Sequence, residues 1–276
     1  MMQVWNIAIK ELNDGLRNRW LLAISLLFAI LAAGIAWLGS AAAGQVGFSS
    51  IPATIASLAS LATFLVPLIA LLLAYDAIVG EEEGGTLLLL LTYPLSRGQL
   101  LLGKFIGHGL ILALATSIGF GSAAVAIALL VSDLDIWLLI QSFSRFIFSA
   151  TLLGWVFLAL AYFLSSKASE KSTAAGLALG VWFLFVLVFD LSLLALLVFS
   201  KGQLNPDLLP WLLLLNPTDI FRQINLSGLG DGSAMNGVMA LGRDLPITNP
   251  GLWFSLFIWL IASLGIAHFA LRRRAI

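Results

Sequence analysis

Residues 173–199 read TAAGLALGVWFLFVLVFDLSLLALLVF and contain one charged side chain, that of Asp190. A helix needs roughly 20 apolar residues to cross the hydrocarbon core of a bilayer, so this stretch is long enough to span one. The whole chain has the same character, since 61% of its 276 residues are hydrophobic and only 10% are charged. Soluble domains carry about 25% charged residues. The sequence therefore predicts an all-α integral membrane protein.

Five further stretches are long and apolar enough to cross a membrane. With the first, they predict six transmembrane helices within a single domain, residues 1–276, at about residues 20–38, 54–79, 101–131, 136–164, 173–199 and 252–271. Ahead of them, residues 2–19 form a helical pattern whose apolar stripe contains Trp5, Ile9, Leu12 and Leu16. This pattern predicts an amphipathic helix at the membrane interface, with a soluble tail as the alternative.

Basic residues concentrate on one side of these spans. If the N-terminus is cytoplasmic, ten of the fourteen Lys and Arg residues fall in inner segments, and the two short outer loops contain none. The positive-inside rule therefore predicts that both termini are cytoplasmic. Residues 80–100 become a cytoplasmic loop, and residues 200–250 an outer segment. In that segment, Asn-Pro pairs at Asn205 and Asn216 predict one or two short helices lying on the outer surface.

Motifs for catalysis or cofactor binding are weak. Residues 98–104, GQLLLGK, fit part of a phosphate-binding loop, but Phe105 replaces the Ser or Thr that holds magnesium, and no strand precedes the motif. The chain has no cysteine and only two histidines, far apart, so we expect no metal site, no cofactor and no enzyme activity. Met235 and Met239 are weak Cu(I) candidates in the outer segment, and we favour surface flexibility as their explanation. A formal net charge of zero gives no indication of nucleic-acid binding.

Four polar side chains fall within or beside the predicted spans, where burying a charge is costly: Asp76, His108, Arg145 and Asp190. They could form a polar path or a conformational lock between spans. They could instead be structural, as an ion pair between Arg145 and Asp190 and a carboxylate of Asp76 that reaches the cytoplasmic edge. We favour the structural interpretation for Asp76, and both stay open for Arg145 and Asp190.

The densest charge cluster lies in the first inner loop, where residues 80–86 read GEEEGGT. Gly84 and Gly85 permit the positive backbone angles of a sharp turn, and Thr86 is suited to cap a following helix. A short helix tipped with Glu81, Glu82 and Glu83 would suit a groove on a soluble partner. A solvated charge cluster is the alternative.

This loop resembles the first cytoplasmic loop of ABC-2-type transporter permeases. The matching residues are Glu81, Glu83, Gly85, Thr86, Leu87, Pro94, Ser96, Arg97, Leu101, Gly103 and Lys104. The six spans, the amphipathic N-terminal helix and the long final outer segment match that family as well. The resemblance implies that residues 81–86 and Arg97 couple the permease to a separate ATPase.

The same resemblance implies a multi-pass protein of the bacterial inner membrane. Its partners would be a second copy of itself, a cytoplasmic ATPase that binds ATP and magnesium, and a periplasmic protein. Other stretches are similar to permeases that serve copper-site assembly of nitrous oxide reductase, either by exporting a substrate or by transmitting force. Two alternatives from other classes are a secondary transporter driven by an ion gradient, supported by Arg145 and Asp190, and a membrane enzyme, for which no constellation is present.

Overall fold

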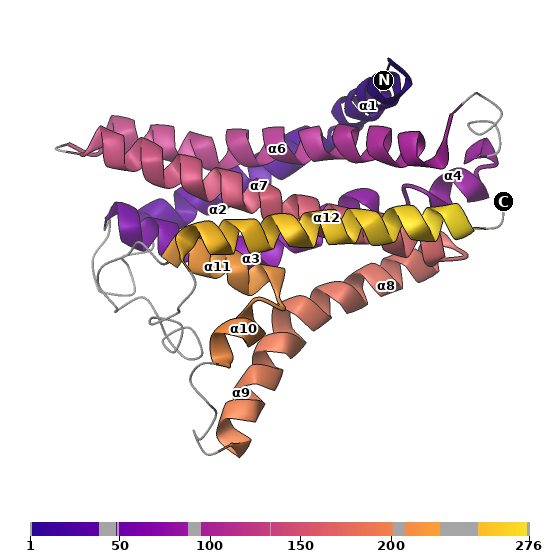
Figure 1. The fold of residues 1–276 in the computed structure, drawn as a ribbon. Helices are drawn as coiled ribbons and strands as arrows, with labels where there is room; N and C mark the ends of the chain where they lie inside the picture. The colour runs from indigo at the N-terminus through magenta and orange to yellow at the C-terminus, as the bar shows by residue number, and fades with distance from the viewer. Residues whose placement is uncertain are drawn as a thin grey trace.

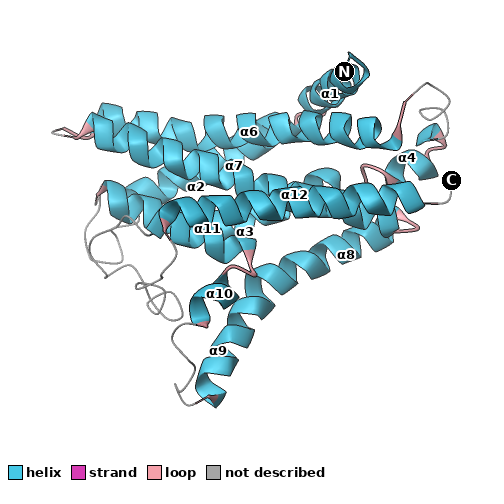
Figure 2. Ribbon diagram, viewed as in Figure 1, coloured by secondary structure: helices cyan, strands magenta, loops and turns pink. Residues whose placement is uncertain are grey.

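The computed structural model describes residues 2–38, 48, 50–87, 95–132, 134–200, 208–226 and 248–274. All regular structure within these ranges is helical (Figure 2). The helices are α1 (Met2–Arg17), α2 (Trp20–Leu38), α3 (Ile51–Ala74), α4 (Val79–Glu83), α6 (Arg97–Leu130), α7 (Ile136–Lys167), α8 (Lys171–Phe183), the π-helix η2 (Leu184–Val188), α9 (Phe189–Phe199), α10 (Leu209–Leu213), α11 (Pro217–Leu226) and α12 (Asn249–Arg273). Six helical stretches are long and apolar enough to cross a membrane, which confirms the predicted fold class.

The long helices run side by side, with α7 at the centre (Figure 1). Helix α7 packs against α3, α6 and α12, and 72% of its most apolar 18-residue stretch is buried. The α8–η2–α9 span diverges from the bundle, and only 11% of its most apolar 18-residue stretch is buried. The helix α1, the helix α4 and the C-terminus lie at one end, which we call the α4 end. Both termini thus lie at the same end of the bundle.

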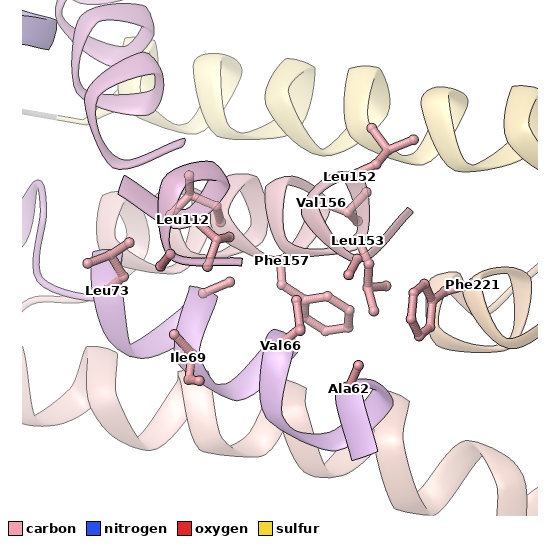
Figure 3. Close-up of a cluster of buried hydrophobic side chains, with 14 of the residues drawn as sticks. Ala62, Val66, Ile69, Leu73, Leu112, Leu152, Leu153, Val156, Phe157 and Phe221 are labelled. Atoms are coloured by element: carbon pink, nitrogen blue, oxygen red, sulfur yellow. The ribbon is translucent and has the colours of Figure 1, made fainter. Parts of the chain in front are cut away.

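The core lies where α3, α6, α7 and α11 meet (Figure 3). Val66 of α3 packs beside Phe157 of α7, and Phe221 of α11 closes the cluster at one side. All three side chains are fully buried. Because lipid tails are as apolar as leucine, close packing rather than expulsion of water holds such helices together. Gly154 of α7 shows how close that packing is, since a Cβ there would lie 2.3 Å from Leu112.

Two helix ends differ from the predicted span boundaries. The second span ends at Ala74 instead of residue 79, because the chain makes a turn at residues 75–78 before α4. The third span begins at Arg97, four residues early, because Ser96 and Gln99 form a capping box. Both changes bring the inner loop directly onto the ends of the spans.

The described part of residues 200–250 contains the short helices α10 and α11, and α11 does not lie on the surface. Residues 217–221 and 223–226 are buried, and α11 packs against α3, α7 and α12. The prediction of surface helices is therefore wrong for α11, because its polar side chains find hydrogen-bond partners inside the bundle. Met235 and Met239 lie outside the described residues.

Candidate functional site

The break between α3 and α4 is held by a single hydroxyl from α7. The backbone N–H groups of Ile78 and Val79 both donate to Oγ of Ser165, at 3.0 and 3.1 Å. These bonds are buried, so they replace the helical partners that the break removes. Asp76 lies in this turn, at the end of the second span, and is half-buried. The position of α4 is therefore fixed relative to α7.

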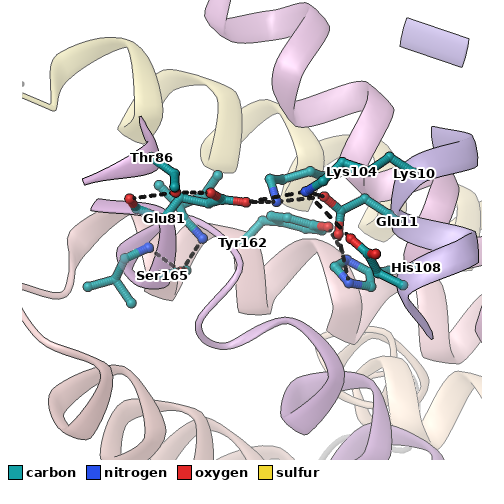
Figure 4. Close-up of polar contacts among 11 residues, drawn as sticks. Lys10, Glu11, Glu81, Thr86, Lys104, His108, Tyr162 and Ser165 are labelled. Atoms are coloured by element: carbon teal, nitrogen blue, oxygen red, sulfur yellow. Dashed lines mark hydrogen bonds and ion pairs between the residues drawn. The ribbon is translucent and has the colours of Figure 1, made fainter. Parts of the chain in front are cut away.

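One lysine joins three helices at this end (Figure 4). Nζ of Lys104, on α6, lies 2.8 Å from Oε1 of Glu11 on α1 and 2.8 Å from Oε1 of Glu81 on α4. The three side chains are only 4%, 9% and 18% exposed. A buried charge is tolerated where it is paired and hydrogen-bonded. Lys10, which is 55% exposed, lies 3.6 Å from Glu11 and adds a second cation at the rim.

Glu11 continues this network toward α7. Burial disfavours its charged form, but the Lys104 ammonium outweighs that effect and lowers the pKa of Glu11 below its ordinary value. Oε2 of Glu11 lies 3.5 Å from Nε2 of His108, and Nδ1 of His108 lies 2.6 Å from the Tyr162 hydroxyl. A polar chain therefore runs from α4 through α6 and α1 to α7. His108 belongs to this chain.

Glu82 and Glu83 bind two other elements. Oε2 of Glu82 accepts a hydrogen bond from Nε of Arg274 at 2.6 Å, and Arg274 also donates to the carbonyls of Ser165 and Ala168. Oε1 of Glu83 accepts from the backbone N–H of Lys171, the first residue of α8, at 2.8 Å. Three consecutive glutamates thus contact α6, the C-terminus and α8. We call Glu11, Glu81, Glu82, Glu83, Lys104, Ser165 and Arg274 the glutamate hub.

The remaining loop residues stabilise the turn and its surroundings. Gly85 has a φ of +69°, the positive angle that glycine allows, whereas Gly84 keeps an ordinary φ of −76°. The Thr86 hydroxyl donates back to the Glu81 carbonyl at 3.0 Å. Nη1 of Arg97 donates to three carbonyls at the end of α12, those of Leu271, Arg272 and Arg274. Residues 88–94 lie outside the described part of the chain.

Comparison with known proteins assigns the chain to a family. The family model described as ABC-2 family transporter protein matches residues 5–275. The chain belongs to the ABC-2 transporter family. It is 74% identical over 275 residues to the protein named "Probable ABC transporter permease protein NosY" of Stutzerimonas stutzeri, covering 99% of both chains. It is 70% identical over 276 residues, all of both chains, to the protein of the same name from Pseudomonas aeruginosa.

The resemblance seen in the loop sequence is therefore confirmed, and the chain is an ABC-2 permease with several membrane-spanning helices. The structure brings Glu81, Glu82 and Glu83 together with partners that the sequence did not single out. Glu11, Ser165 and Arg274 belong to no recognisable sequence motif. Lys104 had appeared only as the end of a false phosphate-binding loop. A lysine three residues into an apolar run was a usable signal, because it needs an acidic partner when buried.

At the opposite end of this ABC-2 permease, Asp190 and Arg145 both reach α11. Oδ2 of Asp190 lies 2.7 Å from Nη2 of Arg222. Arg145 donates to the backbone carbonyl of Ile224. The sequence had suggested an ion pair between Arg145 and Asp190. The partner seen at Asp190 is Arg222, because α11 folds back into the bundle and carries that guanidinium with it.

Proposed function

We propose that this chain is the permease subunit of an ABC transporter powered by a separate, NosF-like cytoplasmic ATPase. Two copies of the chain would bind two ATPase subunits, which hold ATP and magnesium. The work would be done at the opposite face, by export of a substrate or by transmission of force to a NosD-like periplasmic protein. Full-length identity to permeases named NosY supports the assignment to copper-site assembly of nitrous oxide reductase.

The observation that carries this proposal is the set of contacts that α4 makes with other elements. Each of its three glutamates contacts a different element, and Ser165 holds its first turn against α7. Because of these contacts, a displacement of α4 by the ATPase would move α1, α6, α8 and the C-terminus together. A coupling element between an ATPase and six spans must transmit movement in this way.

In this proposal the α4 end faces the cytoplasm, in the inner membrane. The basic residues Lys10, Lys104, Lys171 and Arg274 all lie in the glutamate hub or contact it. That placement agrees with the positive-inside rule. Around α4, the described residues that stay exposed and could bind the ATPase include residues 83–86. Two of these four residues are glycines and one is acidic. Glu81 and Glu82 contribute less to this surface because they are already paired within the chain.

Helix α7 offers a route to the opposite end. Ser165 and Tyr162 lie near one end of the helix, and Arg145 contacts α11 near the other. The twenty residues between Ser165 and Arg145 correspond to about 30 Å at 1.5 Å per residue. A buried, continuous helix of this length moves as a rigid element. Two states of the permease would then differ in how α4 and α11 contact its two ends, as a ligand-driven change requires.

Gly85 is the position at which docking is tested most cleanly. Charge reversal of the glutamates would break pairs inside the chain as well as any contact with the ATPase. Gly85→Asn keeps a residue that tolerates positive φ, and a side chain there meets open space. We expect weaker copurification of the ATPase and lower permease-stimulated ATP hydrolysis, with unchanged thermal stability. Asn18→Gln, at an exposed site in the turn between α1 and α2, is the control.

Wild-type copurification and ATP hydrolysis in Gly85→Asn would show that this surface does not bind the ATPase. Export and force transmission are separated with vesicles that contain the whole complex. ATP-dependent accumulation of a substrate supports export. Nucleotide-dependent movement of the periplasmic partner without accumulation supports transmission.

A further inference from the structure

Two carboxylates share one guanidinium at the end of the bundle opposite α4. Nη2 of Arg222 lies 2.7 Å from Oδ2 of Asp190 and 3.4 Å from Oδ1 of Asp219. Asp219 is 1% exposed and Asp190 lies on α9, so the three groups join α11 to the fifth span. With both carboxylates ionised, the group carries one net negative charge, and its Asp219 carboxylate is buried.

One carboxylate oxygen of this group has no hydrogen-bond donor among the described residues. Oδ1 of Asp219 is buried and accepts no hydrogen bond from any residue in the described ranges. Because the carboxylates of Asp190 and Asp219 both lie beside the same nitrogen of Arg222, they are close to each other. Two neighbouring carboxylates repel each other unless one of them holds a proton. Burial, followed by the effect of Asp190, accordingly raises the pKa of Asp219 to about 7 despite the nearby Arg222.

The same cluster is attached to a structural irregularity of the fifth span. The π-helix η2 leaves the carbonyl of Phe185 available, and Nδ2 of Asn216 donates to it at 2.9 Å. That amide also donates to Oδ2 of Asp219 at 3.1 Å, and the Thr218 hydroxyl reaches the Phe185 carbonyl at 3.4 Å. Single-turn π segments inside helices are frequent at functional sites. Asp219 is therefore linked to η2 through the side chain of Asn216.

We infer that Asp190, Asp219 and Arg222 form a proton-binding site that latches α11 to the fifth span. With the proton bound, the Asp219 hydroxyl donates to Asp190, and the cluster is neutral. Loss of the proton leaves two facing carboxylates with one guanidinium, and their repulsion loosens α11 from α9. This inference concerns the end opposite the glutamate hub and does not rest on ATPase coupling.

The charged groups around the site are few. Helix α11 packs against α3, α7, α12 and η2. Of these, only α7 contributes a charge at this end, that of Arg145, which donates to the Ile224 carbonyl one turn beyond Asp219. The charged residues of α12 lie at the α4 end, and α3 has none. Among the described residues at this site, the titration near neutral pH is therefore assigned to Asp219.

Infrared difference spectroscopy on the purified full-length permease in lipid nanodiscs tests the site. Above a pH of about 5, where carboxyl groups with ordinary pKa values are ionised, a protonated carboxyl band should remain and should disappear with a midpoint near the pKa of Asp219, about 7. Asp219→Asn should abolish the band. Asp190→Asn leaves Asp219 alone with Arg222 and should weaken proton binding about tenfold or more. Asp135→Asn, which removes an exposed carboxylate at the start of α7, should leave the band unchanged.

The latch is tested separately by hydrogen exchange of residues 217–226. We expect protection to fall as the band disappears in the wild type and to stay constant with pH in Asp219→Asn. A band that is absent from the wild type, or that persists in Asp219→Asn, overturns the proton site. Because Asp190→Asn should still fold, an unshifted midpoint in that variant overturns it as well. Protection that does not change with pH in the wild type overturns the latch.

Discussion

Replacing Lys104 by methionine tests whether the buried ion cluster around Lys104 contributes more to stability than the exposed ion pairs near it. Methionine keeps the apolar stem and removes the ammonium, so Glu11 and Glu81 are left near each other with the half-exposed Lys10 as the remaining nearby lysine. We expect the free energy of unfolding to fall by about 3–5 kcal/mol, the usual cost of breaking a buried pair from one side.

The magnitude follows from burial and distance. Each Lys104 contact is 2.8 Å long between side chains that are at most 18% exposed. The gross attraction of one such contact is about 6 kcal/mol at an effective dielectric constant of about 20, and the cost of desolvation offsets most of it. Lys171 and Glu83 are 3.9 Å apart and 46% and 38% exposed, so Lys171→Met should cost less than about 1 kcal/mol. That variant is the matched control.

The assay is denaturant unfolding in micelles, followed by tryptophan fluorescence, with coupled ATP hydrolysis measured in the assembled complex. The double variant Lys104→Met/Glu81→Gln removes one of the stranded carboxylates. It should recover about 1–3 kcal/mol relative to the sum of the single changes. Additive effects, or equal losses in Lys104→Met and Lys171→Met, would refute the reasoning that burial makes this cluster strong.

Two further changes test the contact between α1 and α6 and its charge. Gly107→Ala places a Cβ 2.5 Å from Glu11 and 2.8 Å from the Ala8 carbonyl, and we expect a loss of about 1–3 kcal/mol in unfolding free energy. Gly121→Ala on the same helix meets open space and should be neutral or slightly stabilising. Because the pKa of Glu11 is lowered in the folded state, its contribution is present at neutral pH and is lost as pH falls below about 4.5. Glu11→Gln should flatten this acid limb of stability, measured from thermal unfolding against pH, and an unchanged limb would contradict the pairing with Lys104.

Much of the architecture follows from hydrophobicity over short stretches. The six spans and the helix before them were predictable because crossing a bilayer requires about 20 apolar residues, whatever their neighbours are. The loop residues 80–86 were predictable as a special element because charge and glycine interrupt that pattern. The ends of the spans were less predictable, because a hydroxyl on α7 and a capping box decide them.

Partner choice among the charged residues could not be predicted in the same way. The sequence singled out Asp190 and Arg145, and the structure joins Asp190 to Arg222 from a segment expected on the surface. It also singled out the glutamates of α4 as a free acidic tip, whereas Glu81 and Glu82 are paired with Lys104 and Arg274. Each of these pairs joins residues that are distant in the chain.

The sequence by itself determined that this protein is a helical membrane protein, which loop carries the family motif and which family it resembles. These are local properties, because hydropathy, turn chemistry and motif spacing act over a few residues to a few tens of residues. Only the tertiary structure decided that Lys104 binds Glu11 and Glu81, and that α11 enters the bundle to meet Asp190. In a low-dielectric interior every charge must find a partner, and helix packing decides which partner is within reach.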